Sequence, residues 1–381
     1  MSERPDNNVA TELARTVRPR FLLPVRQAEG LSVAYALQGC HTASVTPFRG
    51  DGGAEVDYQA LRELVEFQLA GGVAGILAVG TTGESPTVTW AEHSEVIART
   101  AEFVGGRACA IAGTGSNSTA ESLESTRHAV EHGANAILLV EPYYNGPSSI
   151  EIRREYMAPL ARAFPDVAMI PYVIPGRTGT QLLPEDLALL ADECPNVDSV
   201  KEATGDLENM RRTRALCGPE FQILSGDDGI THTMMTDESI GACGVISVIS
   251  NVTPAAVSRM TRALLDGDRP EADRLAQALK PLFDIVTVKT QEDSPHGPRL
   301  CRARNPLPVK ALMHALGMPV GPVRRPLGKM TKAGLRIVLD AARAVWTSDP
   351  DILRPIRDAF GADIERRLSE PHYWQDLCYE D

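Results

Sequence analysis

Apolar and polar residues follow two different periods along this chain, and segments of the two kinds alternate. Short apolar runs with strand character end at turn residues, and longer segments between them carry apolar residues at three- and four-residue spacing. Thr89 before Glu92 and Ser118 or Thr119 before Glu121 are helix start signals, and Gly133 is a helix end signal. We expect strands at residues 41–46, 73–79, 108–112, 134–140, 167–173, 197–201, 221–224 and 244–248, and helices at residues 58–69, 91–103, 120–131, 150–163, 184–191, 207–216, 230–237 and 254–266.

Eight strands alternating with eight helices over about 230 residues have the size of a (β/α)8 barrel, and this α/β fold is the prediction. A doubly wound open sheet is the competing fold, and it usually needs fewer units and a glycine-rich first turn. The Gly113-Thr114-Gly115 stretch lacks the third glycine and the later acidic partner of that turn. A dinucleotide cofactor is therefore not supported.

The chain divides into four expected parts. Residues 1–37 have little periodicity and are predicted to be an N-terminal extension, followed by the barrel as the catalytic domain at 38–267. After residue 268 the pattern becomes helical at 270–287, 309–316 and 332–346, with a polar loop at 291–304. We therefore expect a C-terminal helical domain at 268–346 and a partly helical tail at 347–381, with a helix at 352–368.

Composition excludes several classes of function. The net charge of −12 argues against a groove for nucleic acid and against adhesion to anionic membranes. No apolar run approaches the roughly 18 residues of a transmembrane helix, and the polar start lacks the core of a signal peptide. The seven cysteines are scattered without a Cys-x-x-Cys pair. We expect a reduced, cytoplasmic protein without a metal site.

Lys201 is the first candidate for chemistry. It ends the apolar run that begins at Val197, and a Thr204-Gly205-Asp206 turn follows it. Burial disfavours an ammonium group, so a lysine at the end of a buried strand shifts toward the neutral amine, which attacks carbonyl groups and forms Schiff bases. A lysine that extends to the rim and pairs with an acid is the alternative interpretation.

Other polar residues follow the neighbouring strands. Because the carboxyl ends of all eight strands of such a barrel meet at one rim, these side chains are expected to surround Lys201. They are Thr81 and Thr82 after the second strand, Tyr144 after the fourth, and Tyr172 and Arg177 at the end of the fifth. Gly226, without a side chain, follows the seventh strand at the same rim.

This set suits the chemistry of a 2-oxo acid. Lys201 would attack the ketone and form an iminium, which allows the neighbouring carbon to lose a proton and become an enamine. Tyr172 is the natural proton donor and acceptor, with a threonine and a second tyrosine as a relay. Thr81 and Thr82 would hold the carboxylate of the oxo acid, and Arg177 would bind a second carboxylate on the acceptor.

With these residues the chain resembles a known family, the pyruvate-dependent class I lyases of the dihydrodipicolinate synthase and N-acetylneuraminate lyase group. The resemblance covers residues 39–346. Two of its stretches are more similar to the synthase branch, namely Gly176-Arg177-Thr178-Gly179 and Asn305-Pro306-Leu307-Pro308-Val309-Lys310. The others are Gly80-Thr81-Thr82-Gly83-Glu84-Ser85, Pro142-Tyr143-Tyr144-Asn145, Lys201-Glu202-Ala203-Thr204-Gly205, Ser225-Gly226-Asp227-Asp228 and Gly244-Val245-Ile246-Ser247-Val248.

The resemblance implies a role for each matching residue. Lys201 would be the Schiff-base lysine and Tyr172 the proton-transfer tyrosine, with Thr82 linking it to Tyr144 of a neighbouring subunit. Substrate binding would fall to Thr81, Thr82, Gly226, the backbone of Ile246 and Arg177. The implied reaction condenses pyruvate with aspartate semialdehyde to 4-hydroxy-tetrahydrodipicolinate, on the way to diaminopimelate and lysine. The implied assembly is a homodimer or homotetramer without metal or organic cofactor.

A regulatory pocket is also implied, because lysine-inhibited members bind lysine at the dimer interface. The aromatic, carboxylate and amide side chains at the matching positions suit an amino acid, and an ordinary packed interface is the alternative. These positions are Ser85, Trp90, His93, Asn117, Glu121 and Tyr143.

Some features leave other functions open. Val173 stands where the synthases usually have asparagine, which keeps a related aldolase or dehydratase acting on another 2-oxo acid adduct as an alternative. A barrel that has lost catalysis and serves binding is a further alternative. His128-Ala129-Val130-Glu131-His132 matches a zinc-peptidase pattern, but it falls at the end of a predicted outer helix, where a solvated helix end is the favoured interpretation.

Overall fold

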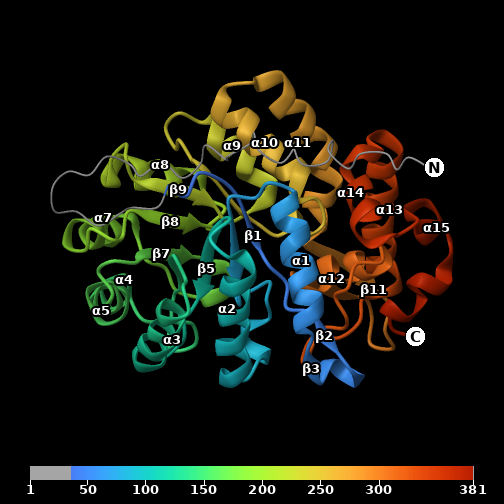
Figure 1. Cartoon of the computed structure of the whole chain (residues 1–381), viewed down its shortest axis with the longest axis horizontal. Coiled ribbons are helices and arrows are strands. Elements are labelled where there is room, and N and C mark those ends of the chain that lie inside the picture. Colours follow the sequence, from blue (N-terminus) through green and yellow to red (C-terminus); the bar gives the residue numbers. More distant parts are fainter. Residues whose placement is uncertain (1–35, 381) are drawn as a thin grey trace, which may run out of the picture.

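The structure, a computed structural model, describes residues 36–380. Its centre is a closed barrel in which all neighbouring strands run parallel, so the predicted (β/α)8 fold is confirmed (Figure 1). The barrel order is β1-β10-β9-β8-β7-β6-β5-β4, with β4 pairing back onto β1. The strands are β1 (Gly39–Ala43), β4 (Gly75–Ala78), β5 (Cys109–Gly113), β6 (Ala136–Val140), β7 (Ala168–Val173), β8 (Ser199–Glu202), β9 (Gln222–Ser225) and β10 (Gly244–Ser247).

Helices surround the barrel and begin where the sequence carries capping residues. Thr89 and Glu92 form a reciprocal capping box at the start of α2, and the Ser118 side chain caps α3. The outer helices are α1 (Tyr58–Ala70), α2 (Trp90–Val104), α3 (Thr119–Glu131), α4 (Ser149–Glu151), α5 (Ala158–Ala163), α7 (Pro184–Glu193), α8 (Leu207–Cys217), α9 (Thr231–Thr236) and α10 (Pro254–Asp266). The predicted helix at 150–163 is interrupted, because a π-helical turn, Ile152–Met157, joins α4 to α5.

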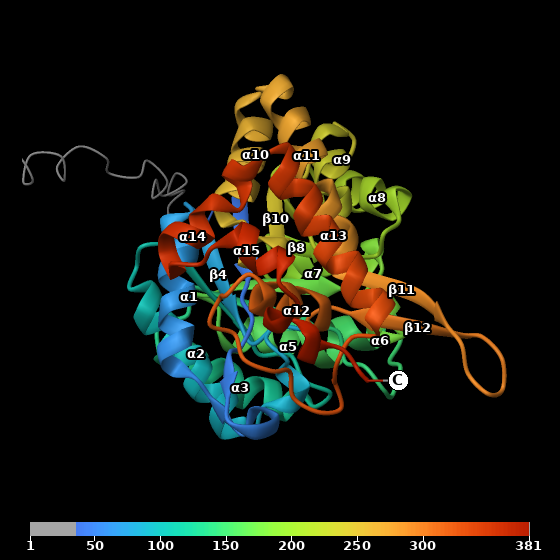
Figure 2. The same cartoon turned by 90° about the vertical axis from the view of Figure 1, so that its right-hand side faces the viewer.

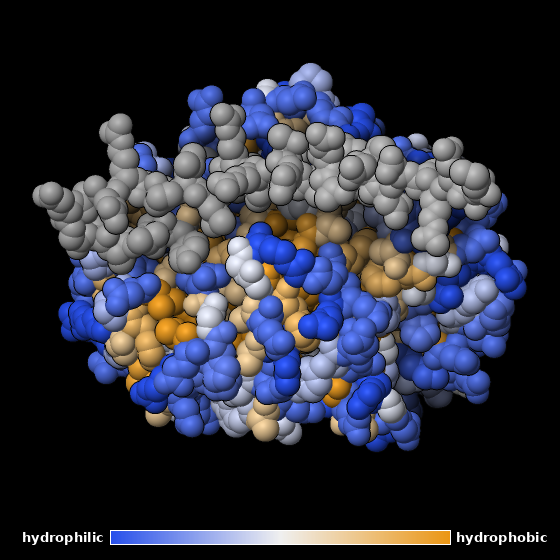
Figure 3. Space-filling model, viewed as in Figure 1, coloured by the Kyte–Doolittle hydropathy of each residue, from blue (hydrophilic) through white to orange (hydrophobic). Residues whose placement is uncertain are grey.

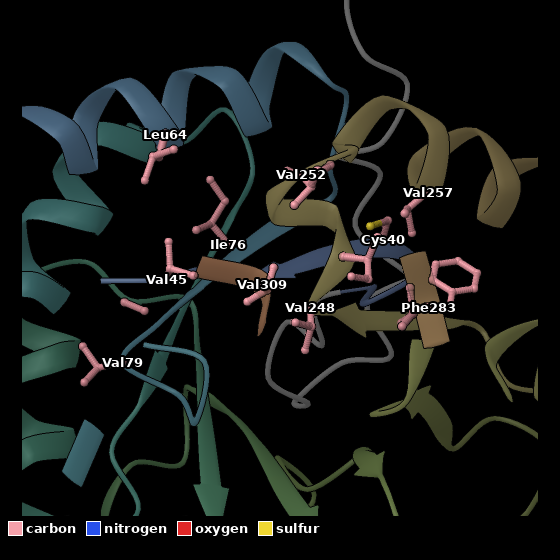
Figure 4. Packing of buried hydrophobic residues seen from close by; sticks show 14 of the residues in the cluster. Cys40, Val45, Leu64, Ile76, Val79, Val248, Val252, Val257, Phe283 and Val309 are labelled. Atoms are coloured by element: carbon pink, nitrogen blue, oxygen red, sulfur yellow. The ribbon is translucent and has the colours of Figure 1, made fainter. Parts of the chain in front are cut away.

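Two apolar layers hold this arrangement together. One fills the inside of the barrel and includes Leu77, Ile111 and Ile246. The other lies between the strands and the outer helices, where Leu64 of α1 and Ile76 of β4 are completely buried (Figure 4). Figure 3 shows apolar residues gathered in the middle of one face, with polar residues around them. The strands are apolar on both sides because both sides are covered.

The segment predicted as a polar loop at 291–304 forms most of a two-stranded antiparallel hairpin, so that prediction is wrong. Its strands are β11 (Thr287–Glu292) and β12 (Arg299–Arg304). The helix predicted at 270–287 is shorter than expected, because α11 ends at Phe283 and residue 287 already belongs to β11. Val288 is buried and Lys289 exposed, so the alternation typical of a half-buried strand is present, but polar composition obscures it.

The C-terminal region is helical apart from this hairpin and packs beside the barrel (Figure 2). It contains α11 (Arg269–Phe283), α12 (Leu307–Ala315), α13 (Lys332–Ser348), α14 (Arg354–Phe360) and α15 (Ile364–Ser369). The single tail helix predicted at 352–368 is two helices, because Gly361 adopts a left-handed conformation with φ of 65°. Phe360 at the end of α14 packs against Phe67 of α1, which ties the tail to the barrel.

A buried ion pair connects this region to the loop after β4. The Lys310 ammonium on α12 lies 2.7 Å from the Glu84 carboxylate, and both side chains are almost inaccessible to solvent. Lys310 also donates to the carbonyls of Thr46 and Pro322, so each of its three N–H groups has an acceptor. The other Glu84 oxygen accepts from the backbone N–H of Arg324. The loop that carries Thr81 and Thr82 is therefore attached to α12.

The first part predicted from sequence, residues 1–37, lies almost entirely outside the described residues. Within residues 36–380, no helix is long and apolar enough to cross a membrane. All seven cysteines lie in that range and none forms a disulfide, in agreement with the expectation of free thiols.

We predict that Lys310→Met lowers the free energy of unfolding by about 3–5 kcal/mol, because it leaves the Glu84 carboxylate buried without its cation. Guanidinium denaturation of the purified protein measures this. Lys280→Met is the matched control, since Lys280 forms an exposed pair with Asp284 and its loss should change stability little. Equal effects of the two substitutions would contradict the prediction.

Candidate active site

Lys201 and Tyr172 lie side by side at the carboxyl ends of neighbouring strands. Tyr172 of β7 is the register partner of Lys201 of β8. The Lys201 amine lies 4.2 Å from the centre of the Tyr172 ring, and both residues are 4% exposed. The structure thus places the predicted lysine and tyrosine within reach of one small substrate.

The environment of Lys201 favours its neutral form. Burial, assisted by the positive charge of Arg177, lowers the pKa of Lys201 to about 7, and the nearby Asp228 carboxylate opposes this shift. At neutral pH a substantial fraction of the amine is therefore unprotonated and able to attack a carbonyl group.

Tyr172 is held by Thr81 and not by Thr82. Burial raises the pKa of Tyr172 to about 12, while Arg177 and a hydrogen bond with the Thr81 hydroxyl act in the opposite direction. The Thr82 hydroxyl instead accepts a hydrogen bond from the Asn305 amide at 2.9 Å. The expected link from Tyr172 through Thr82 is thus corrected to Thr81, because successive residues of the turn direct their side chains to different neighbours.

Gly226 leaves room for the lysine. A Cβ atom at this position would lie 2.7 Å from the Cβ of Ala203 and 3.2 Å from the Cε of Lys201. A larger residue would therefore displace the Lys201 side chain. Ile246, whose backbone was expected to contact substrate, lies one residue before the end of β10 and belongs to the buried layer inside the barrel.

Asp228 was not assigned a role from sequence, yet it is the carboxylate that acts on Lys201. It is buried, and it accepts hydrogen bonds from the Ser247 hydroxyl and from the backbone N–H groups of Val248 and Ile249. Burial raises its pKa to about 6. The second aspartate of the Ser225-Gly226-Asp227-Asp228 stretch was the available signal, because a carboxylate there follows a barrel strand.

Arg177 lies on a short helix, α6 (Pro175–Thr178), after β7. Its Nη2 donates to the carbonyl of Asn305 at 3.1 Å, and part of its guanidinium is packed so that burial lowers its pKa. Buried Glu141 holds the segment by accepting from Ile174 N, from the Thr178 hydroxyl and from Leu182 N. Glu141 was also missed from sequence, although it directly follows a buried strand.

Comparison with known proteins matches this chain to one group of enzymes. Residues 36–344 match the Dihydrodipicolinate synthetase family. A protein from Citrifermentans bemidjiense named 4-hydroxy-tetrahydrodipicolinate synthase is 43% identical over 299 residues, 78% of this chain and 95% of that one. The structure of the 4-hydroxy-tetrahydrodipicolinate synthase from Methylacidiphilum fumariolicum SolV matches with a TM-score of 0.74 and 34% identity, covering 85% of this chain and 99% of that chain.

This chain belongs to the dihydrodipicolinate synthetase family. A further solved structure, DHDPS from Cyanidioschyzon merolae with lysine bound, matches with a TM-score of 0.73 and 36% identity, covering 81% of this chain and 98% of that one. The family match ends at residue 344, so the tail helices α14 and α15 lie beyond it.

Tyr144, a residue that the family resemblance places in the proton relay, does not join Lys201 within the chain. Its side chain is 95% exposed, and its backbone has φ of 102°, which a residue with a side chain rarely adopts. Within the described part of the chain its hydroxyl makes no hydrogen bond. The surrounding structure must hold this strained conformation in place.

The residues expected to bind a regulatory amino acid lie around the starts of α2 and α3. The rings of Trp90 and His93 meet edge to face at 5.3 Å, and Glu121 accepts a hydrogen bond from the Ser116 hydroxyl. Trp90, Asn117, Glu121 and Tyr143 are exposed, Ser85 is half-buried and His93 is buried. Burial lowers the pKa of His93 to about 4, so this ring is neutral at physiological pH.

The zinc-peptidase pattern at His128 and His132 falls at the end of α3. The two rings stack at 4.0 Å, His128 bonds to the carbonyl of Ser94, and His132 bonds to that of His128. No group of three or more His, Cys, Asp or Glu side chains among residues 36–380 is arranged to hold a metal ion. The helix-end interpretation therefore accounts for both histidines.

We predict that the rate of imine formation with pyruvate rises with pH through an inflection near 7. Above this pH Lys201 is neutral, whereas at pH 7 only about one in three thousand molecules of an ordinary lysine is neutral. Trapping with cyanoborohydride from pH 5.5 to 8.5 measures the rate. Asp228→Asn should move the inflection downward, since this carboxylate raises the pKa of Lys201. A trapping rate without an inflection between pH 5.5 and 8.5 would contradict the prediction.

Proposed function

We propose that the protein is a 4-hydroxy-tetrahydrodipicolinate synthase that condenses pyruvate with aspartate semialdehyde through a Schiff base on Lys201. The observation that carries the proposal is the buried amine of Lys201, with its pKa near 7, beside the Tyr172 ring. Relatives with this name, more than 40% identical over most of the chain, support it. The covalent lysine chemistry needs no metal or organic cofactor.

The first half of the reaction activates pyruvate. The neutral Lys201 amine adds to C2 of pyruvate, and the carbinolamine that forms loses its hydroxyl as water to give the iminium. The Tyr172 hydroxyl supplies a proton to the departing hydroxyl, and its bond with Thr81 passes protons onward. Arg177 stabilises the phenolate that exists between these transfers. The Tyr172 phenolate then takes a methyl proton, which gives the enamine.

The second half joins the two substrates. The enamine carbon attacks the aldehyde of aspartate semialdehyde, which forms the new carbon–carbon bond and restores the iminium. The aldehyde oxygen takes a proton from the Tyr172 hydroxyl and becomes the hydroxyl of the product. The acceptor's own amine then displaces Lys201 from that carbon, which closes the ring and frees the enzyme. Arg177 lies at the edge of the site and offers a planar pair of N–H donors to the acceptor carboxylate.

Assembly with a second copy of the chain completes this proposal. Tyr144 is 95% exposed and carries its phenol on a strained backbone, and backbone outliers of this kind cluster at functional sites. We infer that it enters the relay of a neighbouring subunit, so that the active form is a homodimer or a tetramer of dimers.

We predict that borohydride treatment with pyruvate adds one reduced pyruvate to the wild-type protein and none to Lys201→Ala, as read by intact mass. Tyr172→Phe should lower kcat about 10²–10⁴-fold, because it removes the proton donor. A wild type without adduct would refute the proposal. An adduct together with no turnover of aspartate semialdehyde would favour a related aldolase or dehydratase.

Feedback by lysine is the regulatory part of the proposal. The edge-to-face pair of Trp90 and His93 offers an aromatic wall, and the exposed Glu121 carboxylate offers a partner for an ammonium group. The solved lysine complex of the Cyanidioschyzon merolae enzyme supports lysine as the ligand.

We predict that millimolar lysine inhibits the enzyme and that Glu121→Gln raises the half-inhibitory concentration about tenfold, the effect of losing one charged hydrogen bond. Glu124→Gln is the matched control, because Glu124 is exposed on the same helix without belonging to the proposed pocket. Steady-state assays over a lysine titration measure both. Full activity of the wild type in millimolar lysine would contradict the prediction.

A further inference from the structure

The β11–β12 hairpin presents a row of positive charge on one face. In an antiparallel pair, residues directly opposite each other share a face. Lys289 is opposite Arg302 and Thr287 is opposite Arg304, so the two arginines and the lysine point to the same side. The other side carries Val288 and Ala303, and Thr290 there bonds to Thr331 beside α13. We call Lys289, Arg302 and Arg304 the cationic face of the hairpin.

This face borders the segment that carries Arg177. Nη2 of Arg304 donates to the carbonyl of Gly176 at 3.2 Å, and Nη2 of Arg177 donates to the carbonyl of Asn305 at 3.1 Å. Because Gly176 precedes Arg177 and Asn305 follows Arg304, the two bonds join the end of β12 to α6 in both directions. Figure 2 shows β11 and β12 beside α6, with the hairpin extending beyond it.

The arginines are close enough to influence one another. Arg304 and Arg302 both act on Arg177 through their charges and, after burial, are the causes of its lowered pKa. Like charges held together are unfavourable unless an anion lies between them.

That anion is not supplied by the described part of the chain. None of the ion pairs formed by residues 36–380 includes Arg177, Arg302 or Arg304. Arg304 uses one of its five N–H donors on Gly176, which leaves others for a ligand. Lys289 and Arg302, directly opposite each other, add a further unfavourable cross-strand pair of like charges.

We propose that Arg302 and Arg304 form, with Arg177, the anion-binding entrance of the active site and select acceptor aldehydes that carry a carboxylate. This inference rests on the proposed function. Arg304, fixed beside Arg177, provides a second set of donors for the acceptor carboxylate. Arg302, exposed and further out on the same face, attracts the acceptor toward the site. Pyruvate, once bound as an iminium inside the barrel, does not depend on either residue.

The test compares three single substitutions that each remove one positive charge from the hairpin, namely Arg304→Gln, Arg302→Gln and Arg299→Gln. Arg299 is the matched control, because it lies in the same strand but on the opposite face, across from Glu292. Steady-state kinetics with aspartate semialdehyde give the KM and kcat/KM for the acceptor. Deuterium exchange into the methyl group of pyruvate, which needs no acceptor, reports the first half-reaction separately.

Arg304→Gln should raise the KM for aspartate semialdehyde about tenfold, the effect of one lost charged hydrogen bond. Arg302→Gln should lower kcat/KM for the acceptor about threefold at low ionic strength, with the difference from wild type disappearing in high salt. Arg299→Gln should match the wild type, and all three variants should keep the wild-type exchange rate and KM for pyruvate.

Three results would overturn the inference. The first is an unchanged KM for the acceptor in Arg304→Gln. The second is an equal effect of Arg299→Gln, which would show that any positive charge on the hairpin contributes and that there is no defined site. A parallel loss of pyruvate exchange in Arg304→Gln would also overturn it, because the hairpin would then be supporting the barrel. Failure of the wild type to exchange pyruvate refutes the proposed function instead, so the two failures are distinguishable.

Discussion

An amine that is both buried and largely neutral is the constraint on which the rest of this structure depends. Lys201 lies at the end of a strand that is covered on both sides, and burial is the main cause of its low pKa. Asp228 acts against this effect, but its carboxylate is itself held by the Ser247 hydroxyl and two backbone N–H groups. The result is a pKa near neutrality instead of one far below it.

The space around this amine comes from glycine and from strand register. Gly226 provides room for the Lys201 side chain, and the pairing of β7 with β8 sets Tyr172 directly beside it. Neither condition is local, since each depends on the neighbouring strand being in the correct register. A slip of one residue would turn Lys201 toward the outer helices.

Segments far apart in the sequence hold the edge of the site. Asn305 donates to Thr82 and accepts from Arg177, so it bridges the loop after β4 and the segment after β7. The buried pair of Glu84 and Lys310 fastens the same loop to α12. The C-terminal region thus supports the active site, and its hairpin brings positive charge to the entrance. Hydrogen bonds and an ion pair at these two loops define one position for the C-terminal region on the barrel, which apolar packing alone would define less precisely.

The sequence by itself determined the barrel, because the period and the length of the segments follow from which of their sides are buried. It also determined Lys201, Tyr172 and Arg177 as candidates, because the carboxyl ends of the strands of a barrel share one rim. Only the tertiary structure decided that Thr81 and not Thr82 meets Tyr172, since two adjacent threonines are equivalent until the turn directs them. It also decided that the polar segment before Asn305 is a hairpin, and that Arg302 and Arg304 lie near Arg177. The hydrogen bond from Arg304 to Gly176 joins residues 128 positions apart, and no local pattern records such a contact.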